Sequence, residues 1–503
     1  MVEGLNTKQR SKSLHTGSTD KMDRITCIGA GQLSTKKANN RLNRRNQYLN
    51  YGLLSLASVL KRKGLAPVVI HGHFSSPSET LTTAIAYGLA ESKLPILLSL
   101  PSFYAVAWAK EFILQVKALL PSHKIIVGGR WVVGKFPERL KELLPEADII
   151  IPGLAEARIV ELVTGTRSLP LQPSRETSNQ TSSLDYSLLH RREYYQPSIE
   201  IARGCGMKCS FCLERDEKLQ PLKSPDALAD ELQSTLLDDG LIEMTPYFET
   251  SMFVPNKHWS EGLGSAFDAR AIKVRWRTEA RVDTLKAELL PSLAASGLSI
   301  LDLGLESASP TQLLRMHKTQ KPEKYLEKAS RLLVACAENG VKAKVNILLY
   351  AGENDETIAQ TLAWLDQHRE AIYGVSVSPV IVFGWPEETE NYLNTLARYG
   401  ATRDHSPCPG VTHINLSEQV NYEDSLELAR IISKRFMRAG RYYKLKSFSY
   451  FPRDYCFEDF LADMAQEAGS HSFSTAFLEE CIEEVMGQSA HTASSDLMDC
   501  QAS

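Results

Sequence analysis

The chain has 503 residues, of which 43% are hydrophobic and 23% charged, and its formal net charge at pH 7 is −3. This length allows two or three domains with ordinary cores, and the near-neutral charge gives no electrostatic reason to expect a nucleic-acid partner. No apolar run is long enough to span a membrane, and nine cysteines, mostly scattered, do not suggest a secreted disulfide framework, so we expect a cytoplasmic protein.

The first part of the chain alternates short apolar runs with segments of helical periodicity. After a polar tail at residues 1–23, expected to be disordered, the pattern predicts a doubly wound, Rossmann-like α/β domain over residues 24–165. The predicted strands are 24–29, 67–71, 95–100, 124–127 and 147–151, and the predicted helices are 51–64, 78–91, 106–120, one ending near 144, and 155–163. Such a sheet binds ligands at the carboxyl ends of its strands. Residues 166–196, rich in Ser, Thr, Pro and Gln, are expected to be a linker.

The alternation resumes over residues 197–400 and predicts a partial parallel (β/α)6 barrel. The predicted strands are 198–202, 242–248, 273–277, 299–305, 342–349 and 374–383. Residues 401–470 are expected to form a small, mainly helical region, with a helix from 422 to about 439 and an aromatic stretch at 441–455. Residues 471–503 are expected to be a helix and a disordered tail.

Three cysteines follow the first barrel strand. Cys205, Cys209 and Cys212 are separated by three and then two residues, in a glycine-containing loop that lets all three thiolates face one inorganic centre. This spacing favours an iron–sulfur cluster. A cubane cluster needs four ligands, so one iron would stay open for a substrate or cofactor. The alternative is a structural zinc loop, which needs a fourth Cys or His, and none follows Cys212 closely.

The cysteine loop resembles that of the radical S-adenosylmethionine (SAM) enzymes, whose signature is CxxxCxxC with an aromatic residue, here Phe211, before the last cysteine. The resemblance implies a 4Fe-4S cluster whose open iron binds SAM, and an electron donor such as flavodoxin or ferredoxin. It implies SAM contacts at Phe211, Glu249, Arg281, Glu306, Ser307 and Asn346. For Arg281, a helix-capping pair with Asp283 is the alternative.

Residues 24–165 resemble the cobalamin-binding domain that precedes the barrel in many radical SAM enzymes. The residues that carry this resemblance, and the implied cobalamin contacts, are Tyr51, Gly52, Leu53, Ser99, Ser102, Gly128, Gly129, Gly153 and Glu156. The loop after the first strand has no histidine, and His71 and His73 follow the second strand, so cobalamin is expected without a histidine lower ligand. The alternative is a domain that serves structure alone. The basic residues from Lys36 to Arg45 would either face cobalamin or lie in a solvated loop.

Together the two resemblances imply a cobalamin-dependent radical SAM enzyme. The expected activity is C-methylation of an unactivated carbon, through a 5′-deoxyadenosyl radical and methylcobalamin, with the C-terminal region shaping the pocket for a small-molecule or peptide substrate. Two alternatives stay open: ring contraction or cyclisation without net methylation, and a non-enzymatic cobalamin or iron–sulfur sensor. Three cysteines of the C-terminal part have no partner at ligand spacing and are expected to be free thiols: Cys408, Cys456 and Cys481.

Overall fold

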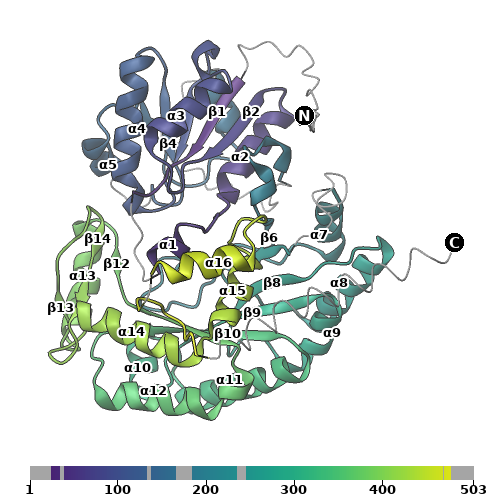
Figure 1. Ribbon diagram of the computed structural model, residues 1–503, viewed down its shortest axis with the longest axis vertical. Coiled ribbons are helices and arrows are strands. Elements are labelled where there is room, and N and C mark those ends of the chain that lie inside the picture. The colour runs from purple at the N-terminus through teal and green to yellow at the C-terminus, as the bar shows by residue number, and fades with distance from the viewer. Residues whose placement is uncertain are drawn as a thin grey trace, which may run out of the picture.

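The computed structural model describes residues 24–33, 39–132, 137–165, 184–234, 245–467 and 469–476. Two large parallel β-sheets, one in each half of the chain, are packed with helices, which confirms the expected α/β class (Figure 1). The tail expected at residues 1–23 and the part of the expected C-terminal tail beyond residue 476 lie outside the described residues, as does Cys481.

The first sheet has five parallel strands in the order β2-β1-β3-β4-β5. They are β1 (Arg24–Gly29), β2 (Ala66–His71), β3 (Ile96–Ser99), β4 (Ile125–Gly128) and β5 (Ile149–Ile150). Because β1 lies between β2 and β3, the chain adds β2 on one side of β1 and then adds β3, β4 and β5 in turn on the other side. A crevice is expected at this point of reversal, outside the carboxyl ends of β1 and β3.

Helices cover both faces of the first sheet (Figure 1). They are α2 (Tyr51–Arg62), α3 (Pro77–Ala86), α4 (Val106–Leu119), α5 (Pro137–Leu143) and α6 (Ile159–Thr164). Alternate residues of β1 enter two different cores, because successive side chains of a strand point to opposite faces. Cys27 packs in the core that contains Leu54 of α2, and Ile28 packs in the core that contains Trp108 of α4. The first of these cores continues into the second half of the chain, where it includes Phe248.

The second sheet has six parallel strands in the order β11-β10-β9-β8-β7-β6. They are β6 (Ser198–Glu200), β7 (Tyr247–Glu249), β8 (Trp276–Arg281), β9 (Leu298–Glu306), β10 (Lys342–Leu349) and β11 (Gly374–Pro379). The helices between them, which line the outer side of this curved sheet in Figure 1, are α7 (Pro225–Leu232), α8 (Lys257–Ala269), α9 (Leu290–Ala295), α10 (Pro310–Arg315), α11 (Pro322–Glu338) and α12 (Asp355–Gln367). The edge strands β6 and β11 do not pair with each other, so the barrel is open.

Several predicted boundaries are corrected by the structure. Strand β8 begins and ends later than the predicted 273–277, because its inward-facing residues Arg277, Glu279 and Arg281 are charged and break the apolar pattern. The predicted helix at 78–91 is divided into α3 and a short 3₁₀ turn at Leu89–Glu91, since Gly88 between them has φ 88°. The run 374–383 forms two strands, β11 and β12 (Val382–Phe383).

The described end of the expected linker is packed rather than extended. Tyr186 is fully buried, and its hydroxyl accepts a hydrogen bond from the Ser198 backbone N–H at 2.8 Å. Leu189 forms a parallel bridge with Val69 of β2. Residues 184–196 therefore connect the edge of the first sheet with the first strand of the second.

An extension with two short antiparallel pairs follows β11. Its elements are β12, α13 (Pro386–Ala397), β13 (Thr402–Arg403), β14 (Val411–Thr412) and β15 (Ile414–Asn415), with β12 paired to β14 and β13 to β15. Trp385 and Val411 of this extension share a core with Phe103, at the start of α4. The extension thus packs against the first sheet's helices.

The C-terminal region consists of α14 (Tyr422–Phe436), α15 (Ala439–Ser447) and α16 (Phe457–Ala465). Its aromatic residues form one core with Leu42 of the short helix α1 (Asn40–Asn43). Arg41 and Arg45 form ion pairs with Asp463 of α16 at 2.6 and 2.7 Å. These two members of the basic segment therefore hold the C-terminal region, while Lys36 lies outside the described residues. Across the described ranges, no helix combines the length and apolar character that crossing a membrane requires.

Candidate active site

The three cysteines lie in the loop that follows β6, at the carboxyl end of the second sheet. The loop turns at Gly204, which has φ 74° and where a Cβ atom would lie 2.3 Å from the Lys218 carbonyl oxygen, so only glycine fits. The Cys205 backbone N–H donates to the Glu217 carbonyl at 2.9 Å, which fastens the start of the loop to its end. Local backbone contacts thereby fold the cysteines into one compact loop.

Burial makes the thiols of Cys205 and Cys212 weaker acids in the absence of a metal. Cys209 is 5% exposed, and burial raises the pKa of Cys212 to about 11 and that of Cys205 above its usual value. The positive charge of Arg281 partly offsets the rise in the pKa of Cys205, and the Nη1 of Arg281 donates a hydrogen bond to Cys209 Sγ at 3.1 Å. A bound cationic metal centre would therefore favour deprotonation of these thiols more strongly than solvent does.

Glu306 ends β9 in a strained position. Its φ is 68°, unusual for a residue with a side chain, and it follows an irregularity in the pairing of β9 with β10. Its Oε1 accepts an ion-paired hydrogen bond from Lys318 Nζ at 3.0 Å, and the same ammonium lies 5.9 Å from the centre of the Phe211 ring. Gly304 makes room for this pair, because a Cβ there would lie 2.9 Å from Glu306 Oε1. The strain and the pairing place a carboxylate beside the cysteine loop.

Arg281 and Ser307, both predicted to contact SAM, have side chains that are engaged inside the fold. Arg281 donates to Asp283 at 2.9 and 3.1 Å, to the Lys318 carbonyl at 2.6 Å and to Cys209, so its guanidinium supports the cysteine loop. Its pair with Asp283 is an ion pair rather than a helix cap. Ser307 is 2% exposed, and its hydroxyl lies 3.1 Å from that of Thr361 on α12. The side chain of Ser307 is thus used in the fold, away from an open surface.

Asn346 lies in the barrel interior. Its Oδ1 accepts a hydrogen bond from Lys344 at 3.0 Å, and Lys344 also binds Asp302 at 2.9 Å. Asp302 in turn forms a bidentate ion pair with Arg277, at 2.6 and 3.0 Å. This network fills the lumen on the side that the C-terminal region covers, since Arg277 also donates to the Leu445 carbonyl at 2.7 Å.

One large cavity joins the carboxyl ends of the two sheets. Its volume is about 2310 Å3, more than twice the roughly 1,000 Å3 at the upper end for sites of drug-sized ligands. The structure brings together at its wall all nine residues predicted to contact cobalamin, namely Tyr51, Gly52, Leu53, Ser99, Ser102, Gly128, Gly129, Gly153 and Glu156. Glu249 lines the same cavity, and so do Arg203 and Gly204 of the cysteine loop.

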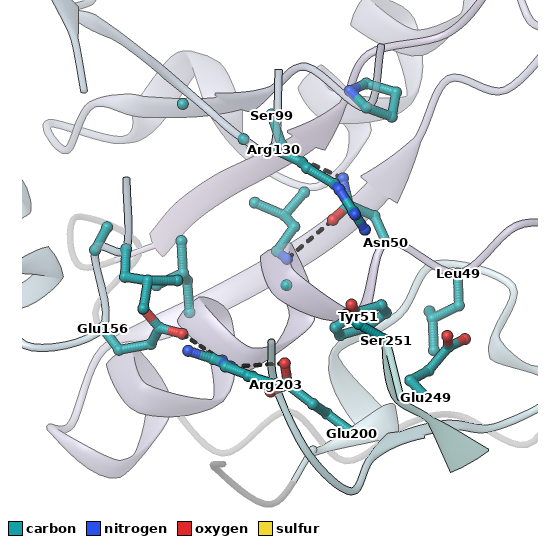
Figure 2. Close-up of a pocket in the computed structure, with 18 of the residues that line it drawn as sticks. Leu49, Asn50, Tyr51, Ser99, Arg130, Glu156, Glu200, Arg203, Glu249 and Ser251 are labelled. Atoms are coloured by element: carbon teal, nitrogen blue, oxygen red, sulfur yellow. Dashed lines mark hydrogen bonds and ion pairs between the residues drawn. The ribbon is translucent and has the colours of Figure 1, made fainter. Parts of the chain in front are cut away.

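The first-sheet side of the cavity is shaped by Asn50 and by glycines. Asn50 accepts a hydrogen bond from the Leu53 backbone N–H at 3.1 Å, which caps α2, and donates one to Ser99 Oγ at 2.9 Å (Figure 2). Gly129 must be glycine, because a Cβ there would lie 2.6 Å from the Leu100 backbone nitrogen. At Gly153 a Cβ would meet no atom within 4 Å. The small residues leave a broad wall that a flat group can approach closely, which fits a corrin ring.

Histidines on this wall are neutral and already used. His71 Nε2 accepts a hydrogen bond from the Asn50 backbone N–H at 2.9 Å, and His73 Nε2 lies 2.9 Å from the Tyr195 hydroxyl. Burial lowers the pKa of His73 to about 4 and that of His71 well below its usual value. One ring nitrogen of each histidine is thus engaged, while His71 Nδ1 is buried without a hydrogen-bond partner among the described residues.

Two acidic residues line the barrel side of the cavity. Glu249, at the end of β7, accepts a hydrogen bond from Ser198 Oγ at 2.9 Å, and burial raises its pKa to about 7. Glu279, which the sequence reasoning missed, points from β8 into the cavity between the inward-facing Arg277 and Arg281. Surrounding protein and then the charge of Glu249 raise the pKa of Glu279 to about 8. Within the described ranges, no group forms a hydrogen bond with its carboxyl.

Ion pairs connect the two sides of the cavity. Arg203 donates to Glu200 at 2.6 and 2.8 Å and to Glu156 of the first domain at 2.9 Å (Figure 2). Arg130, directly after Gly129, pairs with Glu214, two residues after the last cysteine of the loop. Sequence reasoning missed Glu200, Arg203 and Arg130, and their charges at the ends of strands were the only signal available.

The fold and the site define a protein with an open parallel barrel that carries a three-cysteine loop on its rim and faces a doubly wound domain. Residues 199–365 match the family model of the radical SAM superfamily. The chain therefore contains a radical SAM domain, and the resemblance expected from the sequence is confirmed. Such a domain implies a 4Fe-4S cluster and SAM, which favours the cluster over the zinc alternative.

Solved structures show the same fold. The radical SAM methyltransferase TsrM from Kitasatospora setae, with cobalamin and a [4Fe-4S] cluster bound, has a TM-score of 0.58 at 17% identity, over 86% of this chain and 83% of that chain. The cobalamin-dependent radical SAM enzyme OxsB, with aqua-cobalamin and SAM bound, has a TM-score of 0.56 at 16% identity, over 75% of this chain and 56% of that chain. At these identities the likeness shows the fold of the cobalamin-dependent radical SAM enzymes.

The chain is also similar in sequence to a curated protein. The tRNA-2-methylthio-N(6)-dimethylallyladenosine synthase of Acidothermus cellulolyticus is 24% identical over 273 residues, which are 50% of this chain and 51% of that protein. The chain spans about half the length of the curated relatives it matches.

Proposed function

We propose that the protein is a cobalamin-dependent radical SAM enzyme that methylates carbon. The observation that carries this proposal is a cavity shared by the carboxyl ends of both sheets and by Arg203, Gly204 and Glu214, which flank the three cysteines in the chain. A cobalamin held against the first sheet and a SAM held at the barrel rim would both reach this space. When bound, the cluster with SAM would supply radical chemistry and cobalamin would supply a methyl carrier.

The residues of the chain divide into three tasks. Cys205, Cys209 and Cys212 would hold the cluster, and the Glu306 carboxylate, fixed by Lys318, is placed to accept hydrogen bonds from SAM. The glycine wall and the residues predicted to contact cobalamin would orient the corrin.

Glu249 and Glu279 face the remaining space, where we place the substrate, a small molecule or peptide. With pKa values of about 7 and about 8, each carboxyl is partly protonated near neutral pH, so each can donate a hydrogen bond to substrate or exchange a proton with it. Reduction would come from an external donor such as flavodoxin or ferredoxin. We place the protein in the cytoplasm and expect no nucleic-acid partner.

The test begins with protein purified and reconstituted without oxygen and supplied with hydroxocobalamin. We expect about one corrin per chain by absorption spectroscopy, and formation of S-adenosylhomocysteine when SAM and a reductant are added. Iron and sulfide without any bound corrin would overturn the proposal. Formation of 5′-deoxyadenosine without methyl transfer, once the natural substrate is present, would support ring rearrangement instead, and no turnover of SAM at all would support a sensor.

A matched pair of variants tests the place of the corrin. A Cβ at Gly128 has only the Ile151 carbonyl within 4 Å, at 3.8 Å, so Gly128→Phe fits the backbone and occupies the cavity wall. Gly264 on α8 also has room for a Cβ but does not line the cavity, so Gly264→Phe is the control. We expect corrin to be lost in the first variant and retained in the second, with iron content unchanged in both.

A further inference from the structure

The extension after β11 brings two histidines and an aspartate together. Strands β13 and β15 are antiparallel, with Arg403 opposite Ile414, so the next positions inward, Asp404 and His413, are also opposite each other. The Asp404 backbone N–H donates to the His413 carbonyl at 3.0 Å. His405 follows Asp404 on the same loop. One ligand atom from each of the three side chains lies within 4.8 Å of the others.

His413 is held in place by its neighbours. Its ring stacks on Tyr422 at 3.9 Å between centroids, and its Nε2 lies 3.4 Å from the hydroxyl of Tyr104, at the start of α4. The residue is 8% exposed, yet its Nδ1 is buried and has no hydrogen-bond partner among the described residues. A buried nitrogen without a partner is costly, so an ion bound through Nδ1 would remove that cost.

The other two side chains face the same point. His405 Nδ1 lies 3.3 Å from Asp404 Oδ2, and the rings of His405 and His413 meet edge to face at 4.8 Å. Two imidazoles and a carboxylate are ligands that suit Zn²⁺, which binds three protein groups and a water molecule in many sites. A hydrogen bond from Nε2–H of His413 to the Tyr104 hydroxyl would fix the tautomer that leaves Nδ1 free for the metal.

We propose that Asp404, His405 and His413 form a zinc site that braces the extension against the first domain. Tyr104 belongs to the first domain, and the neighbouring Gly410 packs so closely on Phe103 that a Cβ there would lie 2.5 Å from the Phe103 ring. The ion would thus hold the loop from residue 404 to 413 in the shape that contacts α4. This site is separate from the cysteine loop and does not depend on the proposed function.

In the test, the full-length, cluster-loaded protein is dialysed against excess zinc, and unbound zinc is removed by gel filtration. Zinc and iron in the protein are then measured by mass spectrometry. We expect about one zinc per chain in the wild type. His405→Ala should lose it with iron content unchanged, because His405 is exposed and its loss leaves the fold intact. His258→Ala, an exposed histidine on α8, is the control and should keep zinc.

A second measurement removes the competing thiols. In the variant with Cys205, Cys209 and Cys212 replaced by alanine, Co²⁺ should give visible absorption bands of a low-coordinate site, and Asp404→Asn or His405→Ala should weaken binding at least about 100-fold. Zinc absent from the wild type, or retained equally by His405→Ala, would overturn the proposal and leave His405 and Asp404 as a simple surface pair. Cobalt binding equal in the cysteine-free protein with and without His405→Ala would overturn it as well.

Discussion

Replacing Arg277 by methionine should destabilise the barrel by about 3 kcal/mol, near the lower end of the range for breaking a buried ion pair. The side chains of Arg277 and Asp302 are 1% and 4% exposed, and their two hydrogen bonds are joined by a third from Arg277 to the Leu445 carbonyl. The substitution leaves Asp302 with one partner, Lys344, at 2.9 Å, so its charge stays partly compensated.

The same network sets an order among three variants. Asp302→Asn should cost more, about 5 kcal/mol, because it leaves two cations, Arg277 and Lys344, without their carboxylate. Lys344→Met should cost only about 1 kcal/mol, because Lys344 is 20% exposed and Asp302 keeps its bidentate partner. The double variant Arg277→Met with Asp302→Leu should be milder than Asp302→Asn, since it leaves no buried guanidinium without its carboxylate.

Urea unfolding followed by tryptophan fluorescence measures this order, because the neighbouring Trp276 is fully buried and reports on the barrel. The reasoning would be refuted if Lys344→Met were as costly as Asp302→Asn, or if Arg277→Met cost less than about 1 kcal/mol. Either result would mean that the buried charges are compensated by something other than the hydrogen bonds described above.

Three further outcomes follow from the site. Gly204 and Gly206 have φ of 74° and 70°, so alanine at either position bears a similar backbone strain. Only at Gly204 would the Cβ also collide with a carbonyl oxygen at 2.3 Å, so Gly204→Ala should keep much less iron after reconstitution than Gly206→Ala, and equal iron contents would contradict this. Arg281→Lys should lower the cluster's midpoint potential by up to about 100 mV in an EPR-monitored titration, since a charge-assisted hydrogen bond to the Cys209 sulfur is lost. An unchanged potential would show that this hydrogen bond does not influence the cluster's redox potential. Burial raises the pKa of Glu249 to about 7, so the folded state holds this proton more tightly than the unfolded state, and stability should fall as pH rises from 5 to 8. Thermal unfolding of Glu249→Gln should lack that part of the pH dependence, and identical profiles would count against the buried carboxyl.

The apolar runs located β1, β3 and β4 well, because both faces of those strands are buried, whereas β5 is only two half-buried residues of the predicted 147–151. β8 was placed too early for the opposite reason, since its inward positions carry charge and only the folded barrel gives that charge partners. The cysteine loop and Glu306 could be located because their spacing follows from local chemistry. Glu279 and Arg203 could not, because their role depends on two distant segments meeting at one cavity.

Ser307 illustrates a further limit of the sequence. A hydroxyl directly after a strand can face a ligand or satisfy a turn, and both uses need the same residue. In this structure the Ser307 hydroxyl accepts a hydrogen bond from the Ser309 backbone N–H at 3.1 Å and lies 3.1 Å from the Thr361 hydroxyl on α12. Likewise, Arg41 and Arg45 were assigned to a ligand or to solvent, whereas their partner, Asp463, lies more than four hundred residues away in the chain.

The ion pairs of Arg203 and Glu214 lie on either side of the three cysteines, and both reach the first domain, at Glu156 and Arg130. The order of the cysteine loop is therefore a property of the whole chain. Loading of the first domain and assembly of the metal centre share one set of charges, so neither half can be regarded as an independent module that was simply joined to the other.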